Sequence, residues 1–241
     1  MIPGPATSPG RTDATPTSRS SAAPSRGWLG TSAMVLVAWA VILGAVLALG
    51  WLVTGPLRSG VDPWDNDVSR WFADQRTPTL TTLADAGTLL GETPVGAGVA
   101  AVVAIALSVW QRSWRPAAFF ALLIVGIGAF YAVATMLITR QRPPVKILDP
   151  GLVPNDSFPS GHVATATAAY AGTAVIVWFL APALRRWVAV LFAIPVIEVL
   201  ARLYEGAHHL TDVATSVLYT TAWMAVLVVA LILPGRERTT Q

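Results

Sequence analysis

The strongest constraint on this chain is the recurrence of long, almost uninterrupted apolar stretches. An α-helix needs about 20 apolar residues to cross a hydrocarbon core of roughly 30 Å. Because 54% of the residues are hydrophobic and only 12% are charged, we expect the bilayer to be the solvent. The fold class is predicted to be all-α, an integral membrane bundle of six transmembrane helices. The expected spans cover about 33–53, 94–110, 116–139, 162–180, 187–203 and 213–233.

The sequence outside the spans divides the chain into three parts. Residues 1–27 are rich in Pro, Ser, Thr, Ala and Gly, which predicts a disordered tail because little apolar surface is available to offset the entropy of ordering. Residues 28–235 are expected to form the six-span domain, and residues 236–241 a short cytoplasmic tail. The first span is longer than the apolar core of a secretory signal, about 7–15 residues, so we expect it to remain.

The segment between the first two spans has the period of an amphipathic helix. Apolar residues recur there at steps of three and four among acidic residues, which predicts a helix lying on the membrane surface. The residues of this pattern are Val61, Trp64, Val68, Trp71 and Phe72. We expect a second group to extend the same surface layer: Leu80, Leu83, Leu89 and Leu90.

Basic residues in the short connections predict the orientation. They fall on the side of the N-terminal tail, which the positive-inside rule assigns to the cytoplasm. These residues are Arg112, Arg115, Arg185, Arg186, Arg236 and Arg238. We therefore expect a multi-pass protein of the plasma (inner) membrane with both termini in the cytoplasm.

Composition also excludes several classes of function. The chain has no cysteine, so disulfides, thiolate metal sites and cysteine nucleophiles are excluded. Its formal net charge is only +3 and its basic residues form no continuous run, so no nucleic-acid partner is expected. The sequence does not specify an oligomeric state.

The histidines and three arginines gather at the predicted outer ends of the spans. His162, His208 and His209 all fall at or beside the outer ends of the last three spans. A second set shares this face: Arg140, Arg142 and Arg202. A cation buried at a membrane face costs free energy unless it has an anionic partner, so this cluster indicates an anion site.

The residues before the fourth span predict an oxyanion cradle. Ser160 is positioned to cap the helix, and Gly161 lets an anion approach the first backbone N–H groups at the positive end of the helix dipole. His162 follows in the first turn, where its imidazole can donate a proton to a leaving-group oxygen.

A second pattern lies at the start of the last span. His208 and Asp212 are four residues apart, which puts both on one helix face. We expect the Asp212 carboxylate to accept the Nδ1 proton of His208, leaving Nε2 free to attack phosphorus and form a phosphohistidine. Arginine guanidinium groups suit the oxygens of the transferred phosphoryl group, and Arg140, Arg142 and Arg202 are available for this.

These motifs resemble the three signatures of the type 2 phosphatidic acid phosphatase family, K-x6-R-P, P-S-G-H and S-R-x5-H-x3-D. The resemblance covers roughly residues 33–233 and implies a metal-independent membrane phosphatase without a cofactor, acting on a lipid phosphate or lipid diphosphate at the outer membrane face. It implies that His208 is the nucleophile, His162 the general acid and Asp212 the residue that orients His208. The matching segments are Arg142-Pro143, Pro159-Ser160-Gly161-His162 and Arg202-x5-His208-x3-Asp212. The phosphate-binding residues implied are Arg142, Ser160, Gly161 and Arg202.

Two positions depart from the family patterns. Thr135 stands in place of the first-motif Lys and Ala201 in place of the third-motif Ser, and Arg140 is our candidate to replace the lost cation. These departures leave open a catalytically weakened phosphate-binding protein. A small anion transporter is a further alternative, since charged rings at pore mouths also select ions. The lipid substrate stays open among phosphatidate, phosphatidylglycerol phosphate, polyprenyl diphosphate and a polyprenyl-linked sugar phosphate.

Several polar residues have a structural interpretation beside the functional one. His209 is expected to be an interfacial spectator, and Glu198, within the fifth span, has structural and functional interpretations of equal weight. Lys146, Asp149 and Asp156 are expected to be solvated loop residues. A metal site built from histidines and Asp212 is disfavoured by the arginines beside it.

Overall fold

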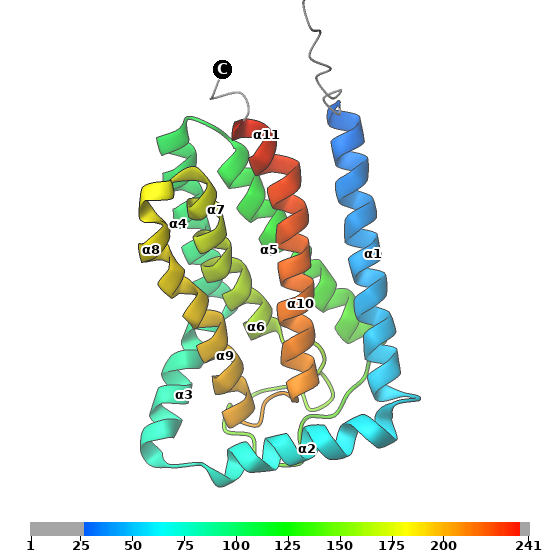
Figure 1. Ribbon diagram of the computed structural model, residues 1–241. Coiled ribbons are helices and arrows are strands. Elements are labelled where there is room, and N and C mark those ends of the chain that lie inside the picture. Colours follow the sequence, from blue (N-terminus) through cyan, green and yellow to red (C-terminus); the bar gives the residue numbers. More distant parts are fainter. Residues whose placement is uncertain (1–26, 237–241) are drawn as a thin grey trace, which may run out of the picture.

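The computed structural model describes residues 27–236 and shows a helical bundle crossed at one end by a further helix (Figure 1). Six helical segments are long and apolar enough to span a membrane, which confirms the prediction with small shifts at the ends. They are Leu29–Thr54, Thr93–Gln111, Arg115–Leu137, Gly161–Leu180, Pro182–Tyr204 and Leu210–Ile232. Residues 1–26 and 237–241, which contain almost all of the two predicted tails, lie outside the described residues.

The first three spans are continuous α-helices and the last three are interrupted. The first three are α1 (Trp28–Thr54), α4 (Thr93–Gln111) and α5 (Arg115–Leu137). The fourth consists of α6 (Gly161–Ala166), a π-helical turn η1 (Thr167–Ala171) and α7 (Gly172–Leu180). The fifth consists of η2 (Pro182–Leu184), α8 (Arg185–Val188), η3 (Ala189–Phe192) and α9 (Ala193–Tyr204). The sixth consists of α10 (Leu210–Leu227) and η4 (Val228–Ile232), followed by α11 (Leu233–Arg236).

The fourth span is the central helix of the bundle. In its most apolar window 78% of the residues are buried, against 11% for the first span. Small residues make this possible, because without bulky side chains the neighbouring helices approach closely. The small buried residues of this span include Ala164, Ala166, Ala168, Ala169, Ala171 and Gly172. The predicted site residue His162 therefore begins the most enclosed helix of the fold.

The predicted amphipathic helix is present as α2 (Arg58–Asp74), which runs across the ends of the spans (Figure 1). Its inner side contacts α9 and α10, and its only buried residues are Asp65 and Ser69. Trp64 and Trp71 stay exposed. The face of α2 toward the bundle thus carries a buried carboxylate.

The second predicted surface segment is organised differently. Residues 78–91 form α3 (Pro78–Gly91), which packs along α9 and does not continue the layer of α2. The reason is a face of small residues, since a Cβ at Gly87 would lie 3.2 Å from Ala201 Cβ and 3.3 Å from Ile197 Cγ2. Leu80, Leu83 and Leu89 stay exposed, and the small residues between them form the face of α3 that contacts α9.

Candidate active site

The site is assembled where the connection 138–160 passes the ends of α6, α9 and α10. Two segments of this connection pair through their backbones: Arg140 N donates to Asn155 O at 3.0 Å, and Ser157 N donates to Arg140 O at 3.1 Å. This pairing brings the segment before α6 against the segment after α5. Residues far apart in sequence are thereby held beside one another without a regular sheet.

His208 lies in the turn between α9 and α10 and is 3% exposed. The turn depends on Gly206, whose φ of +70° is a conformation that side-chain-bearing residues rarely adopt. His208 Nδ1 lies 2.6 Å from the backbone oxygen of Ser157. Because a carbonyl oxygen can only accept, Nδ1 carries the proton and Nε2 is left with a free lone pair.

The expectation that Asp212 accepts the Nδ1 proton is not met. The closest approach of Asp212 to His208 Nδ1 is 3.9 Å, too long for a hydrogen bond. Asp212 Oδ2 instead accepts from Ser157 Oγ at 2.6 Å and from the backbone N–H of His209 at 2.9 Å. The Ser157 backbone oxygen, and not Asp212, is the partner of His208 Nδ1. The Asp212 carboxylate therefore acts on His208 indirectly, by orienting Ser157.

Arg140 is committed to carboxylates, so the geometry does not support the expectation that it binds phosphate. It is 5% exposed. Its Nη1 donates to Asp212 Oδ1 at 2.5 Å and its Nη2 to Asp65 Oδ2 at 2.8 Å. Burial opposes its charge, but Asp212 and Asp65 outweigh that cost and raise the pKa of Arg140 above its ordinary value.

Arg142 is held by backbone carbonyls alone. Its Nε donates to Val153 O at 2.9 Å, Nη1 to Ala207 O at 2.5 Å and Nη2 to Asp156 O at 3.1 Å. Burial and the charge of Arg202 lower the pKa of Arg142 from its ordinary value, although a guanidinium stays protonated at neutral pH. Its positive charge is fixed in place without an ion pair among the described residues.

Arg202 is fully buried between two carboxylates. Its Nη1 donates to Glu205 Oε2 at 2.7 Å, and its Nη2 lies 2.9 Å from Asp149 Oδ2. Glu205 also accepts from Thr88 Oγ1 at 2.8 Å. Arg202 Nε has no hydrogen-bond partner among the described residues. The expectation that Asp149 is only solvated is therefore wrong, since this residue is 22% exposed and binds Arg202.

The start of α6 matches the predicted cap. Ser160 is the N-cap residue and its side chain accepts from Val163 N at 3.5 Å, while its own N–H donates to Ser216 Oγ at 2.8 Å. Ser160 is fully buried, and a Cβ at Gly161 would lie 3.3 Å from the ring of Tyr131. His162 follows directly, in the first turn.

A cavity of about 210 Å³ brings the predicted residues together. Its lining includes His162, His208, Gly161 and Arg142, and the rest of its wall comes from α4, α5, the connection and the following turn of α6. Those wall residues are Thr93, Ala97, Ile124, Ile127, Gly128, Tyr131, Leu152, Ala164 and Thr165. Ser160, Asp212, Arg140 and Arg202 support the cavity from behind and do not line it.

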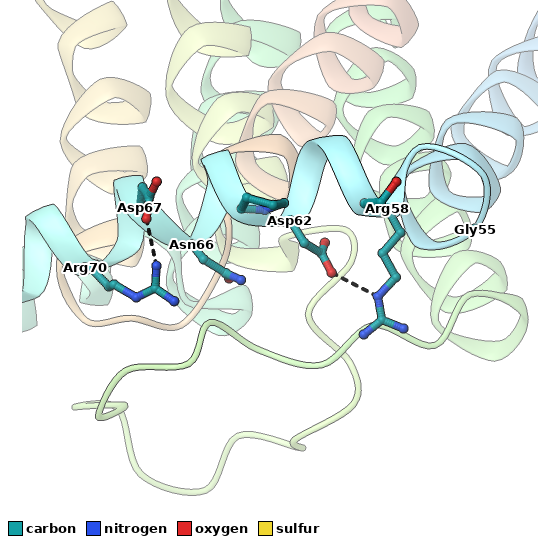
Figure 2. Close-up of a pocket in the computed structure, with 8 residues that line it drawn as sticks. Gly55, Arg58, Asp62, Asn66, Asp67 and Arg70 are labelled. Carbon is teal, nitrogen blue, oxygen red and sulfur yellow. Dashed lines mark hydrogen bonds and ion pairs between the residues drawn. The ribbon is translucent and has the colours of Figure 1, made fainter.

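A larger depression of about 650 Å³ lies on the outer side of α2, and Figure 2 shows its residues. Its charges pair with one another: Arg58 donates to Asp62 at 3.0 Å and Arg70 to Asp67 at 2.7 Å. Both pairs are largely exposed, and no histidine lies in the lining of this depression. It therefore carries less chemistry than the smaller cavity.

The remaining predicted positions lie outside the cavity. The Thr135 hydroxyl donates to Tyr131 O at 3.0 Å within its own helix, so it places no group where a lysine would reach. His209 accepts or donates through Nε2 to Asn66 at 3.2 Å, on α2. Glu198 is fully buried beside Gly91, and neither carboxylate oxygen has a hydrogen-bond partner among the described residues.

Three residues that support the site were not predicted from the sequence. Asp65 carried a usable signal, because it falls four residues after Val61 and three before Val68, on the inner face of the amphipathic pattern. Glu205 also carried one, since it lies three residues after Arg202 on the same helix. Ser157 acts through its backbone oxygen and its hydroxyl, and nothing in its sequence context identified it.

Comparison with known proteins gives two matches. A family model described as the PAP2 superfamily matches residues 116–232. Among solved structures, the fold is similar to a transmembrane PAP2 type phosphatidylglycerolphosphate phosphatase from Bacillus subtilis, with a TM-score of 0.67 and 20% sequence identity over 84% of this chain and 97% of that chain. No curated protein sequence matches this chain. The family match includes every motif residue that lines the cavity.

The surroundings of His208 predict its titration. Burial and then the charge of Arg202, with a smaller contribution from Arg142, lower the pKa of His208 well below 6.5, and Asp212 opposes this only in part. The ring should therefore stay neutral at pH 7 and become charged only at a pH below the range in which histidines ordinarily titrate. Histidine-labelled protein, with the His208 signal assigned by its loss in His208→Gln, should show by NMR an Nδ1–H tautomer. The Arg142→Gln variant should move the titration toward 6.5, and a wild-type midpoint at or above 6.5 would contradict the prediction.

Proposed function

We propose, because this chain belongs to the PAP2 superfamily, that it hydrolyses a lipid phosphate or lipid diphosphate without a metal ion. The observation that carries the proposal is that His162, His208 and Arg142 line one cavity whose remaining wall is largely apolar. An anionic headgroup suits the histidines and the arginine, and an alkyl chain suits the apolar residues.

The first chemical step is attack by His208 on phosphorus. Its Nδ1 proton is held by the Ser157 carbonyl, so the neutral Nε2 carries the lone pair that forms the N–P bond. As the P–O bond to the lipid breaks, His162 donates a proton to the leaving oxygen. The product of this step is a phosphohistidine and a lipid that has lost one phosphoryl group.

The second step returns the enzyme to its starting state. His162, now neutral, accepts a proton from a water molecule whose oxygen attacks phosphorus and displaces His208. Inorganic phosphate leaves, and the proton that His162 gave to the lipid is replaced from water. Each histidine thus ends the cycle in the protonation state in which it began.

Negative charge on the phosphoryl oxygens needs fixed donors. Arg142 supplies a guanidinium that carbonyls hold in one orientation, and the first N–H groups of the fourth span point outward next to Gly161. Arg202 Nε has no hydrogen-bond partner among the described residues, but Arg202 does not line the cavity, so Arg142 is the arginine placed to bind the phosphoryl oxygens. Thr135 contributes none, because its hydroxyl is bonded to its own helix.

The substrate class follows from the apolar wall. Ile124, Ile127 and Gly128 of α5 face Ala97 of α4 across the same cavity, within the spans. A water-soluble phosphate ester would leave this surface exposed to water, whereas a lipid chain covers it. The similar Bacillus subtilis protein is described as a phosphatidylglycerolphosphate phosphatase, so this lipid belongs in the panel of substrates to be tested.

We propose further that the site faces the non-cytoplasmic side of the plasma membrane and that both termini are cytoplasmic. Arg112 follows α4, Arg115 begins α5, and Arg185 and Arg186 begin α8. These helix ends lie at the end of the bundle opposite α2 (Figure 1). Vesicles of known orientation should release phosphate only when substrate is added to the side that corresponds to the outer face. Release from the cytoplasmic side alone would reverse the assignment.

Hydrolysis itself is tested by phosphate release from purified protein in EDTA. We expect release from at least one lipid among phosphatidate, phosphatidylglycerol phosphate, polyprenyl diphosphate and a polyprenyl-linked sugar phosphate. His208→Ala should reduce turnover about a thousandfold or more, because the nucleophile is removed. Radioactive substrate should leave an acid-labile, base-stable label on the wild type and none on His208→Ala.

A catalytically weakened protein is the second candidate. Thr135 favours it, because this residue replaces the family lysine and its hydroxyl is bonded to Tyr131 O of its own helix. Vanadate binding by the wild type without phosphate release from any lipid would support it. Activity that requires a divalent metal would instead overturn the histidine mechanism.

The role of His162 is tested by changing the leaving group. The nitrophenolate released from a nitrophenyl phosphate is a stable anion that needs no proton, whereas the alcohol released from a lipid phosphate must be protonated as it leaves. His162→Ala should therefore slow phosphoenzyme formation from the lipid by about 100-fold or more, and much less from the nitrophenyl ester. Rapid-quench measurement of the labelled intermediate separates this step from hydrolysis, and equal losses for both substrates would contradict the assignment.

A further inference from the structure

The inner face of α2 contacts the charged groups behind the candidate site through Asp65. Asp65 is fully buried, and its Oδ2 accepts from Arg140 Nη2 at 2.8 Å and from Thr211 Oγ1 at 2.5 Å. Its Oδ1 accepts from the backbone N–H of Thr211 at 3.2 Å. The side chain of neighbouring Asp67 is 74% exposed and, within residues 27–236, pairs only with Arg70 (Figure 2). The two carboxylates of one helix thus have different environments.

We propose that Asp65 and Arg140 are positioning residues that set the orientation and tautomer of His208. This inference rests on the proposed function for its catalytic consequence. Neither residue lines the cavity, so neither is expected to touch the substrate. They act through Asp212 and Ser157.

The first link is the guanidinium of Arg140. It bridges Asp65 at 2.8 Å and Asp212 at 2.5 Å, and its Nη1 also donates to Thr211 Oγ1 at 2.6 Å. A buried cation shared by two carboxylates cannot move toward one without losing contact with the other. Asp65 therefore fixes the position of the Arg140 guanidinium relative to the Asp212 carboxylate.

The second link runs from Asp212 to the imidazole. Asp212 Oδ2 holds the Ser157 hydroxyl at 2.6 Å, and Ser157 O contacts His208 Nδ1 at 2.6 Å. The backbone of Arg140 reinforces this link, because its carbonyl accepts from Ser157 N at 3.1 Å. Arg140 thus holds Ser157 through its side chain and its main chain.

Removing the charge of Asp65 should change this geometry. Without the charge of Asp65, the buried Arg140 keeps Asp212 and a longer contact to Asp62 at 3.6 Å, so Asp212 is expected to turn toward the guanidinium and weaken its hydrogen bond to Ser157. The Ser157 carbonyl then loses its fixed direction, and a displacement of the nucleophile of about 1 Å can cost about 100-fold in rate.

The attachment of α2 does not depend on Asp65 alone. Arg76, just beyond the end of α2, donates through Nε and Nη2 to Tyr204 O at 3.1 and 3.0 Å, and Thr77 N donates to the Tyr204 hydroxyl at 2.9 Å. Phe72 packs against the buried clusters around Ala84 and Val163. These contacts should keep the helix in place in an Asp65→Asn variant.

The test compares Asp65→Asn with Asp67→Asn in the full-length protein. On the best lipid phosphate of the panel, Asp65→Asn should lower kcat by about tenfold to 100-fold with KM changed less than threefold, since the lining of the cavity is intact. Asp67→Asn should stay within twofold of the wild type in both parameters. NMR of histidine-labelled protein should show a loss of the pure Nδ1–H tautomer of His208 in Asp65→Asn alone.

The outcomes separate this inference from the proposed function. A folded Asp65→Asn protein with wild-type kcat and an unchanged His208 tautomer would overturn the inference. If Asp65→Asn does not fold, Arg140→Lys decides, because lysine keeps the charge but cannot bridge both carboxylates: an unchanged kcat and tautomer would likewise overturn it. If the wild type hydrolyses no lipid phosphate, the proposed function fails, and the NMR comparison still decides whether Asp65 orients His208.

Discussion

The structure depends on one buried arrangement of charge, the Arg140 guanidinium between Asp65 and Asp212. All three side chains are 5% exposed or less. Buried ions cost free energy unless their remaining hydrogen-bonding capacity is filled, and here Thr211, Ser157 and the His209 backbone fill most of it, while Arg140 Nε has no hydrogen-bond partner among the described residues. The partners come from α2, the connection 138–160 and the start of α10, so the cluster can form only when these segments meet in one arrangement.

The two histidines are held by different means, and this difference suits their proposed roles. His162 begins the central span, whose small residues pack on every side, so its position follows from the helix. His208 lies in a turn that glycine makes possible, and the hydrogen bond from its Nδ1 to Ser157 O orients its ring. A nucleophile needs one ring nitrogen free and one bound, which a loop residue facing a carbonyl achieves. A general acid such as His162 needs only to lie within hydrogen-bond distance of the leaving oxygen.

Much of the fold and part of the site could be predicted from the sequence. Apolar stretches of span length fix the six crossings, and the Ser160 to His162 motif fixes a helix start, because both depend on local patterns. The partner of His208 could not be predicted in this way. Its spacing to Asp212 places both on one helix face only if the helix begins at His208, but α10 begins at Leu210 and the turn moves the ring toward Ser157. A contact made by a backbone carbonyl across a folded connection, such as Ser157 O with His208, cannot be predicted from the spacing of side chains in the sequence.

The three arginines that the sequence groups together differ in the charge they leave for a substrate. Arg140 faces Asp65 and Asp212, and Arg202 faces Asp149 and Glu205, so each is neutralised within the protein. Arg142 is bonded only to carbonyl oxygens, which orient a guanidinium without cancelling its charge. A guanidinium has five N–H donors, and three bonds to carbonyls leave two. Since Arg142 also lines the cavity with both histidines, it is the cation with both the free charge and the free donors to bind an incoming phosphate. The absence of a lysine at Thr135 therefore leaves the electrostatic attraction for substrate to this one residue and the start of the fourth span.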